Sequence, residues 1–292
     1  MLALDLFVFH RGGRIVRSHE ALAWTGLWIG LAAAFAGLIF FWQGRQTALE
    51  FVTGYILELS LSVDNLFIFL VIFRYFSVPE QHQRSVLFWG VLGALVMRGL
   101  FILAGVGLIH RFHWIFYVLG ALLIYSGVRL GFMREHQVDP AKNPAVMALR
   151  RWMPVTDEYQ DGHFFVRGWK GNPGLYATPL LIVLVVIETT DVLFAVDSIP
   201  AVLAVTLNAF IVYTSNVFAI LGLRSMYFAV SGLMRVFRFL HAGLALVLIL
   251  VGLKMIAADY LQVSTVVTLG AVAGVLMVSV AASIAYPAPG EK

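Results

Sequence analysis

Long apolar stretches dominate this chain and restrict what it can fold into. Each of eight stretches provides about 20 mostly apolar residues, which is the length that a helix needs to cross about 30 Å of hydrocarbon. They cover Ala21–Trp42, Glu50–Phe73, Val86–Ile109, Trp114–Met133, Tyr176–Thr206, Ala209–Leu233, His241–Ala258 and Val263–Tyr286. The sequence therefore predicts an all-α, polytopic transmembrane helical bundle with eight full spans.

The composition supports this prediction and excludes other classes of protein. Of the 292 residues, 61% are hydrophobic and 12% are charged, whereas about a quarter of a typical soluble domain is charged. A soluble globular domain, a disordered chain and a nucleic-acid binder are excluded, although the net charge is +4. The chain has no cysteine, which excludes disulfides and thiolate metal sites. No phosphate-binding glycine loop or Ser-His-Asp order is evident, so we do not expect an enzyme.

The basic residues predict how the chain is oriented in the membrane. If Arg11–Glu20 is cytoplasmic, fifteen of the 20 Lys and Arg residues fall on the cytoplasmic side and two on the other. This places the C-terminus in the cytoplasm. Met1–Phe9 is apolar but too short to cross alone, so we expect it to be an N-terminal partial span. A long cytoplasmic loop, residues 134–175, separates a first transmembrane half, residues 1–133, from a second, residues 176–292.

Five acidic residues lie inside two of the predicted spans, where charge is most costly. Glu58 and Asp64 belong to the second span, and Glu188, Asp191 and Asp197 belong to the fifth. An ionisable group near the bilayer centre costs about 2.5–3.5 kcal/mol on insertion scales. These acids must therefore face a polar cavity, pair with a cation or bind a proton.

The two acidic spans resemble each other. Residues 58–65 read Glu-Leu-Ser-Leu-Ser-Val-Asp-Asn, and residues 191–198 read Asp-Val-Leu-Phe-Ala-Val-Asp-Ser. Because the predicted orientation makes these spans antiparallel, the pattern predicts inverted-topology repeats. In many secondary transporters such repeats hold the substrate at the bilayer midplane, on helices that break there. Pro200 would loosen the second of these helices.

Helical spacing sorts the polar residues by face. Residues three, four and seven apart share a face of a helix. Two shared faces result, one with Glu58, Ser62 and Asn65, the other with Glu188, Asp191 and Ser198. We expect each face to line the same polar site.

Two acids lie off these faces. Asp64 and Asp197 point about 120° away on an ideal helix. Either the helices unwind at these residues, or the two acids meet basic partners. Arg98 and Arg224, each in the following span, are the candidates for such partners.

The chemistry of these side chains predicts a site for a hard cation. Carboxylate, amide, hydroxyl and carbonyl oxygens suit Mg²⁺, Ca²⁺ and Mn²⁺. The predicted metal ligands are Glu58, Asp64, Asn65, Glu188, Asp191, Asp197 and Ser198. Ser62 would complete the oxygen shell, and Asn216 would either supply an oxygen or tie helices together. Arg98 and Arg224 would balance charge, since they repel a cation.

Longer motifs carry a family resemblance. They are Glu58-Leu-Ser-Leu-Ser-Val-Asp64-Asn65, Ala177-Thr-Pro-Leu, Glu188-Thr-Thr-Asp191-Val-Leu-Phe-Ala-Val-Asp197-Ser198-Ile-Pro200 and Thr214-Ser-Asn216-Val-Phe-Ala-Ile-Leu-Gly-Leu-Arg224-Ser-Met-Tyr-Phe. With these motifs the chain resembles the TerC/Alx family of integral membrane proteins, within a wider superfamily that includes lysine exporters. The resemblance implies nine spans, manganese export and metal homeostasis in the bacterial inner membrane. It also implies an association with tellurium resistance.

Together, the acids and the resemblance favour a secondary transporter that exports Mn²⁺ in exchange for protons. Mn²⁺ would be the transported ion and not a permanently bound cofactor, and the expected partners are the lipid bilayer, the cation and protons, with no nucleic acid. Two alternatives stay open. One is a membrane scaffold for a stress-response complex, with the loop of residues 134–175 as its docking surface. The other is an exporter of another cation, such as Ca²⁺ or a basic amino acid. The sequence does not indicate an oligomeric state.

Overall fold

The computed structural model describes residues 18–132, 143–160, 162–230, 239–261 and 263–285. Within these ranges, the side chains of Asp64 and Arg224 are not described. The predicted partial span Met1–Phe9 lies outside the described residues, so it stays a prediction.

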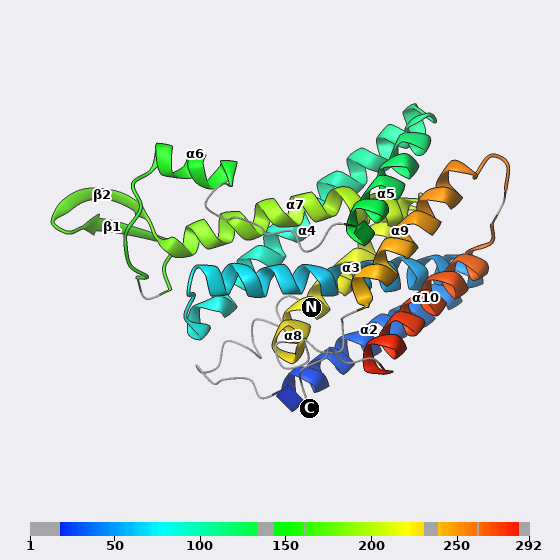
Figure 1. Ribbon diagram of the computed structural model, residues 1–292, viewed down its shortest axis with the longest axis horizontal. Helices are drawn as coiled ribbons and strands as arrows, with labels where there is room; N and C mark the ends of the chain where they lie inside the picture. The colour runs from blue at the N-terminus through cyan, green and yellow to red at the C-terminus, as the bar shows by residue number, and fades with distance from the viewer. Residues whose placement is uncertain (1–17, 133–142, 161, 231–238, 262, 286–292) are drawn as a thin grey trace.

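Each of the eight predicted spans is a helix in the structure (Figure 1). These helices are α2 (Ser18–Gln43), α3 (Arg45–Tyr75), α4 (Glu80–Arg111), α5 (Ile115–Phe132), α7 (Pro179–Leu203), α8 (Ala209–Val230), α9 (Leu240–Ile256) and α10 (Thr265–Ala285). Six of them are long and apolar enough to cross a membrane within the described residues, and the apolar parts of α8 and α9 are shorter. The helical class is therefore confirmed, while the number of spans and the inverted repeats stay predictions.

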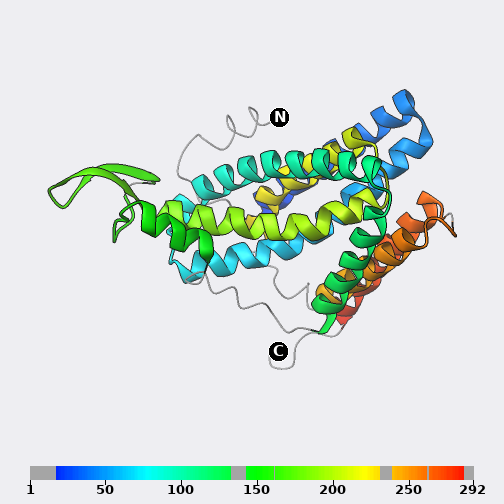
Figure 2. The ribbon, with the colours of Figure 1, turned by 90° about the horizontal axis from the view of Figure 1, so that it is seen from above.

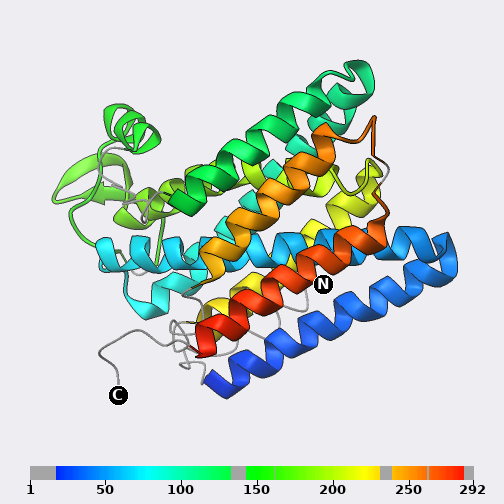
Figure 3. The same cartoon turned by 45° about the vertical axis from the view of Figure 1, so that its right-hand side comes forward.

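The helices that carry the predicted site form the centre of the bundle. Helix α3 packs against α2, α7, α8 and α10, and α4 packs against α7 and α8. Helices α5 and α9 pack closely against each other, side by side in Figure 3, and they also contact α7 and α10. Gly44, at a φ of 90°, gives the sharp reversal between α2 and α3 because glycine alone adopts this backbone region without strain.

The predicted cytoplasmic loop contains short elements of its own. Helix α6 (Pro144–Trp152) is followed by the antiparallel strands β1 (Phe165–Trp169) and β2 (Asn172–Ala177). This hairpin projects from one end of the bundle, which we call the hairpin end (Figure 2). The all-α prediction missed the hairpin. The predicted start of the fifth span at Tyr176 was also wrong, because β2 continues to Ala177 and α7 begins at Pro179.

Of the two alternatives for Asp64 and Asp197, the structure does not show the one in which the acidic helices unwind. Helix α3 is continuous from Arg45 to Tyr75, and α7 is continuous through Pro200 to Leu203. Pro200 lies in the last turn of α7, where its missing N–H removes only one helical hydrogen bond. The backbone N–H of Ala204 still donates to the Pro200 carbonyl at 2.9 Å. The site is therefore built on intact helices.

Glycines bring α5 and α9 into backbone contact. A Cβ atom on Gly120 would lie 3.0 Å from the Gly252 carbonyl oxygen, and one on Gly252 would lie 2.7 Å from the Gly120 carbonyl oxygen. A Cβ atom on Gly127 would lie 2.7 Å from the carbonyl oxygen of Ala245. Such small residues allow the close approach of helices in membranes.

Gly127→Ala should therefore destabilise the protein. The added methyl group meets backbone, which cannot move aside as a side chain can, and overpacking of this kind costs about 1–3 kcal/mol. Gly131→Ala, one turn later on α5, is the matched control, because its Cβ would make an ordinary 3.4 Å contact with the Ala245 Cβ. Thermal unfolding in detergent should show a lower midpoint for Gly127→Ala alone. Equal midpoints for the two variants would contradict this packing.

Candidate functional site

Arg98 of α4 is the centre of the buried polar contacts that link α3, α4 and α7. It forms an ion pair with Glu58 of α3. Its Nε and Nη2 atoms donate to the two carboxylate oxygens of Asp191 of α7, at 3.2 and 3.0 Å. Its Nη1 donates to the Ser198 hydroxyl at 3.2 Å. Arg98 is only 1% exposed and Glu58 is fully buried, so these contacts are shielded from solvent.

This pairing corrects one prediction and supports another. Arg98 was a candidate partner of the off-face acids, but it pairs with the shared-face acids Glu58 and Asp191. Asp197 instead faces α5, where the Ser126 hydroxyl donates to its Oδ1 at 2.6 Å. The structure therefore separates Asp197 from Asp191, as the 120° offset on an intact helix requires.

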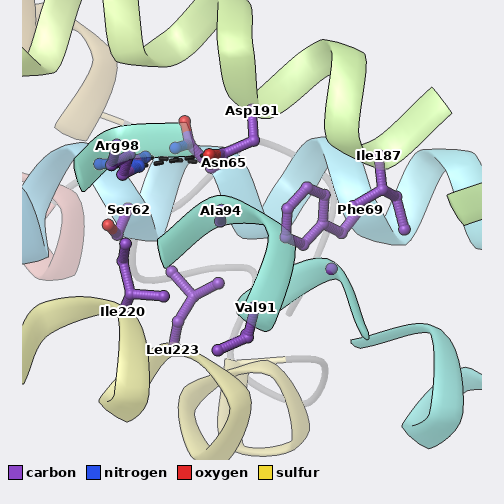
Figure 4. Close-up of a pocket in the computed structure, with 11 residues that line it drawn as sticks. Ser62, Asn65, Phe69, Val91, Ala94, Arg98, Ile187, Asp191, Ile220 and Leu223 are labelled. Atoms are coloured by element: carbon purple, nitrogen blue, oxygen red, sulfur yellow. Dashed lines mark hydrogen bonds and ion pairs between the residues drawn. The ribbon is translucent and has the colours of Figure 1, made fainter. Parts of the chain in front are cut away.

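A small cavity lies beside these contacts (Figure 4). It measures about 20 Å³, which is room for one water molecule or one ion. Its polar lining comes from Ser62, Asn65, Arg98 and Asp191. These are members of the two predicted shared faces and the arginine between them, so α3 and α7 do present these residues to one site.

Apolar side chains close the other side of the cavity. They are Phe69, Val91, Ile187, Ile220 and Leu223. On α3, α4 and α7, these residues lie nearer the hairpin end than the polar residues do, because α3 runs toward that end and α4 and α7 run away from it. An ion that entered from the hairpin end would have to pass this apolar layer.

Three buried oxygens on helices that line the cavity have neither a hydrogen-bond nor an ion-pair partner among the described residues. They are Glu58 Oε2, Ser62 Oγ and Asn216 Oδ1. Ser62 lines the cavity and lies one turn beyond Glu58 on α3, and Asn216 lies one turn before Ile220 on α8. A buried polar atom without a partner is costly and calls for a ligand, a water or an ion. Of the three, only Ser62 lines the cavity, while Asn216 belongs to α8, whose Ile220 lines it.

Glu188 lies apart from the arginine. It is half-buried, one turn nearer the hairpin end than Asp191, and it makes no hydrogen bond or ion pair with any described residue. Its carboxylate packs against Gly93 of α4, where a Cβ atom would lie only 1.9 Å from Oε1. Glycine at position 93 thus makes room for this carboxylate.

The described side chains do not form a ready metal centre. No three carboxylates or imidazoles among them come close enough to share one ion. Instead, the guanidinium of Arg98 stands between Glu58 and Asp191, in the place where the sequence predicted a cation. Where Asp64 and Arg224 point lies outside what the structure describes.

Sequence reasoning missed two polar partners of the acidic helix α7. Ser126 of α5 binds Asp197, and Asn143 at the start of α6 donates to the Thr189 hydroxyl at 2.8 Å. Asn143 also accepts hydrogen bonds from two backbone N–H groups of α6, of which Ala145 is the nearer at 2.9 Å. The pair Asn143-Pro144 is a helix-start signal that the sequence does carry. Nothing in the spacing of Ser126 signals its role.

Two acids outside the spans have clear electrostatic partners. Lys170 donates to Asp157 at 2.8 Å, and this bond holds the pKa of Asp157 below its usual range. The Tyr117 hydroxyl and then His113 bind Asp259, and they likewise lower the pKa of Asp259. Both acids are well exposed and already paired, so neither is a candidate ligand.

Comparison with known proteins decides the family. The profile of the Integral membrane protein TerC family matches residues 43–289. This chain belongs to the TerC family. It is 46% identical over 284 residues to the membrane protein STKORF319 of Myxococcus xanthus, which covers 97% of this chain and 88% of that one. It is 45% identical over 289 residues to the membrane-bound protein Alx of Escherichia coli (strain K12), which covers 96% of this chain and 89% of that one.

The TerC family membership places the helices in a lipid bilayer. With its apolar helices, the chain is an integral multi-pass membrane protein. No solved structure matches this chain.

Proposed function

We propose that this TerC-family chain is a secondary transporter that exports a divalent cation, Mn²⁺, in exchange for protons. The observation that carries the proposal is that Glu58 and Asp191 meet at the buried Arg98, beside a cavity that Asp191 and Arg98 line. Two carboxylates at this depth are too costly to keep for packing alone. They lie on the two helices with the repeated acidic motif, as an alternating-access site would require.

The residues around the cavity suit a hard cation. Carboxylate oxygens of Glu58 and Asp191, the Ser62 hydroxyl and the Asn65 amide are oxygen donors, which Mn²⁺, Mg²⁺ and Ca²⁺ accept. Composition and geometry do not separate these ions. The resemblance to manganese exporters favours Mn²⁺.

The remaining acids of the repeat would mark the ion path. Glu188 lies between the hairpin end and the cavity, so a cation from the cytoplasm would meet it before Asp191. Asp197 lies two turns beyond Asp191, near the opposite end. Asp64 belongs to the same motif on α3. Protonation of these carboxylates on the outer side would weaken cation binding and favour release.

The name of the Alx relatives proposes a membrane-bound redox modulator. This chain has no cysteine, so thiol exchange is not among its own chemistry. We propose that such a protein would influence redox state by changing the cytoplasmic concentration of a redox-active metal ion.

Ion flux through the purified protein is the test of this proposal. Proteoliposomes loaded with a manganese-sensitive dye should take up Mn²⁺ when their lumen is acidic, and the uptake should fall when the pH gradient is collapsed. Protein-free liposomes are the control. Absence of Mn²⁺ flux with folded protein would contradict the proposal and favour the scaffold. In that case deletion of the loop of residues 134–175 should remove the cellular phenotype while acid substitutions in the spans leave it intact.

A further inference from the structure

The buried charges at the site do not balance. Glu58 and Asp191 contribute two negative charges, and Arg98 contributes one positive charge that never titrates at physiological pH. Among the described residues, Arg98 is the cation that pairs with both carboxylates, and this pairing lowers the cost of burying them. Without Arg98, the same two charges would match one divalent cation.

We propose that Arg98 is a tethered competitor of the transported ion. Its guanidinium holds Glu58 and Asp191 when no metal ion is bound, and it must leave them for the ion to bind. This inference rests on the proposed function. It gives Arg98 a role in the release and binding of the ion, beyond the balancing of charge. The competition would keep the two carboxylates paired with a cation in every state of the transport cycle.

The position of Arg98 at the cavity indicates that the ion and the guanidinium compete for the same carboxylates. Glu58 keeps one oxygen, Oε2, without a hydrogen-bond partner among the described residues, and Ser62 Oγ is also unpartnered. The cavity that Ser62 lines is bounded by Arg98 itself. An ion in this cavity would sit against a guanidinium, and like charges a few ångströms apart in a low-dielectric interior repel strongly. Binding therefore requires the guanidinium to move.

Ser198 can keep a hydrogen bond with the guanidinium after Arg98 is displaced from Asp191. It lies two turns beyond Asp191 on α7, and it already accepts a hydrogen bond from Arg98 Nη1 at 3.2 Å. Arg98 can release Asp191 and keep this bond, so it need not lose all of its partners at once. A long flexible side chain on an intact helix can make this change without unfolding α4.

A fixed structural tie would behave in the opposite way. If Arg98 only held the helices together, its removal would disorder the site and weaken metal binding. If Arg98 competes with the ion, its removal should strengthen metal binding. The direction of the change in affinity therefore separates the two roles.

The test is equilibrium binding of Mn²⁺ to the full-length protein in detergent, followed by titration calorimetry and by Mn²⁺ efflux from proteoliposomes. Arg98→Gln should bind Mn²⁺ at least about tenfold more tightly than the unmodified protein, because it removes a competitor that makes charge-assisted bonds. It should also release Mn²⁺ more slowly. Lys254→Gln is the control, since Lys254 is a part-buried cation that donates to the Ala204 carbonyl away from the cavity, and its Mn²⁺ affinity should not change.

Arg98→Lys covers the case in which Arg98→Gln does not fold. Lysine keeps the charge but cannot bind a carboxylate with two parallel bonds, so it competes less well, and Mn²⁺ affinity should rise a few-fold. Weaker or unchanged Mn²⁺ affinity in a folded Arg98 variant overturns the inference. If the unmodified protein transports Mn²⁺ and the variants do not bind it more tightly, only the inference fails. If the unmodified protein neither binds nor transports Mn²⁺, the proposed function fails with it.

Discussion

Asp191→Asn should abolish manganese tolerance in a strain without other exporters, and it should lower Mn²⁺ flux about 10- to 100-fold. The substitution removes one of the two carboxylates at the cavity while keeping the shape of the side chain. A charged contact of this kind contributes about 1.5–3 kcal/mol, and each 1.4 kcal/mol is a factor of ten. Arg98 keeps its ion pair with Glu58, so the protein should still fold. Flux in proteoliposomes and growth on manganese measure the effect.

Two control variants sharpen this prediction. Asp157→Asn makes the same chemical change at an exposed acid that pairs with Lys170 outside the spans, and it should keep full flux. Ser198→Ala removes a neutral partner of the same guanidinium and should lower flux only modestly, since a neutral hydrogen bond contributes about 1 kcal/mol. Full manganese tolerance of Asp191→Asn at equal expression would show that the cavity is not the transport site.

Glu188→Gln should remove transport without lowering thermal stability. Glu188 has no hydrogen bond or ion pair with any described residue, so its charge contributes no such contact to the fold. Neutralising a half-buried carboxylate without a partner removes a desolvation cost, and the unfolding midpoint should hold or rise. Mn²⁺ flux should fall at least about tenfold if the carboxylate binds the passing ion. A stable variant with normal flux would exclude Glu188 from the path.

The neighbouring glycine allows a second test of the same carboxylate. Gly93→Ala keeps Glu188 charged but forces its carboxylate to move, because the new Cβ atom would overlap it. Its flux should fall with that of Glu188→Gln. Gly107→Ala on the same helix has open space around its Cβ position and should behave like the unmodified protein. An effect of Gly107→Ala equal to that of Gly93→Ala would attribute the loss to α4 in general.

The sequence predicted the helices well because apolar length alone decides them. Lipid supplies no hydrogen bonds, so a long apolar stretch has to satisfy its backbone internally as a helix. It also predicted which polar residues share a face, because that follows from 3.6 residues per turn. Asp191 and Ser198, which were predicted to share one, do accept hydrogen bonds from the same guanidinium. Pro200 misled the prediction, since proline near a helix end costs only one hydrogen bond.

The partners of these acids could not be predicted from spacing. Which helix lies opposite Asp191 depends on how eight helices pack, and the chain order does not state it. Arg98 was recognised as a buried cation, but it pairs with Asp191 and not with Asp197, because α4 meets the shared face of α7 and α5 meets the other. The hairpin of β1 and β2 was hidden in a polar loop whose turn, Lys170-Gly171, has positive φ at both residues.

The backbone contact between α5 and α9 has a consequence for movement. A helix that slides by one residue moves about 1.5 Å, and here it would drive a side chain into a carbonyl oxygen that leaves no room for one. We therefore expect the two helices to move together as one rigid unit. The hydrogen bond between Ser126 of α5 and Asp197 of α7 connects this unit to the central helices. Asp197 therefore links the α5–α9 pair to α7, and we expect removal of its carboxylate to loosen that contact.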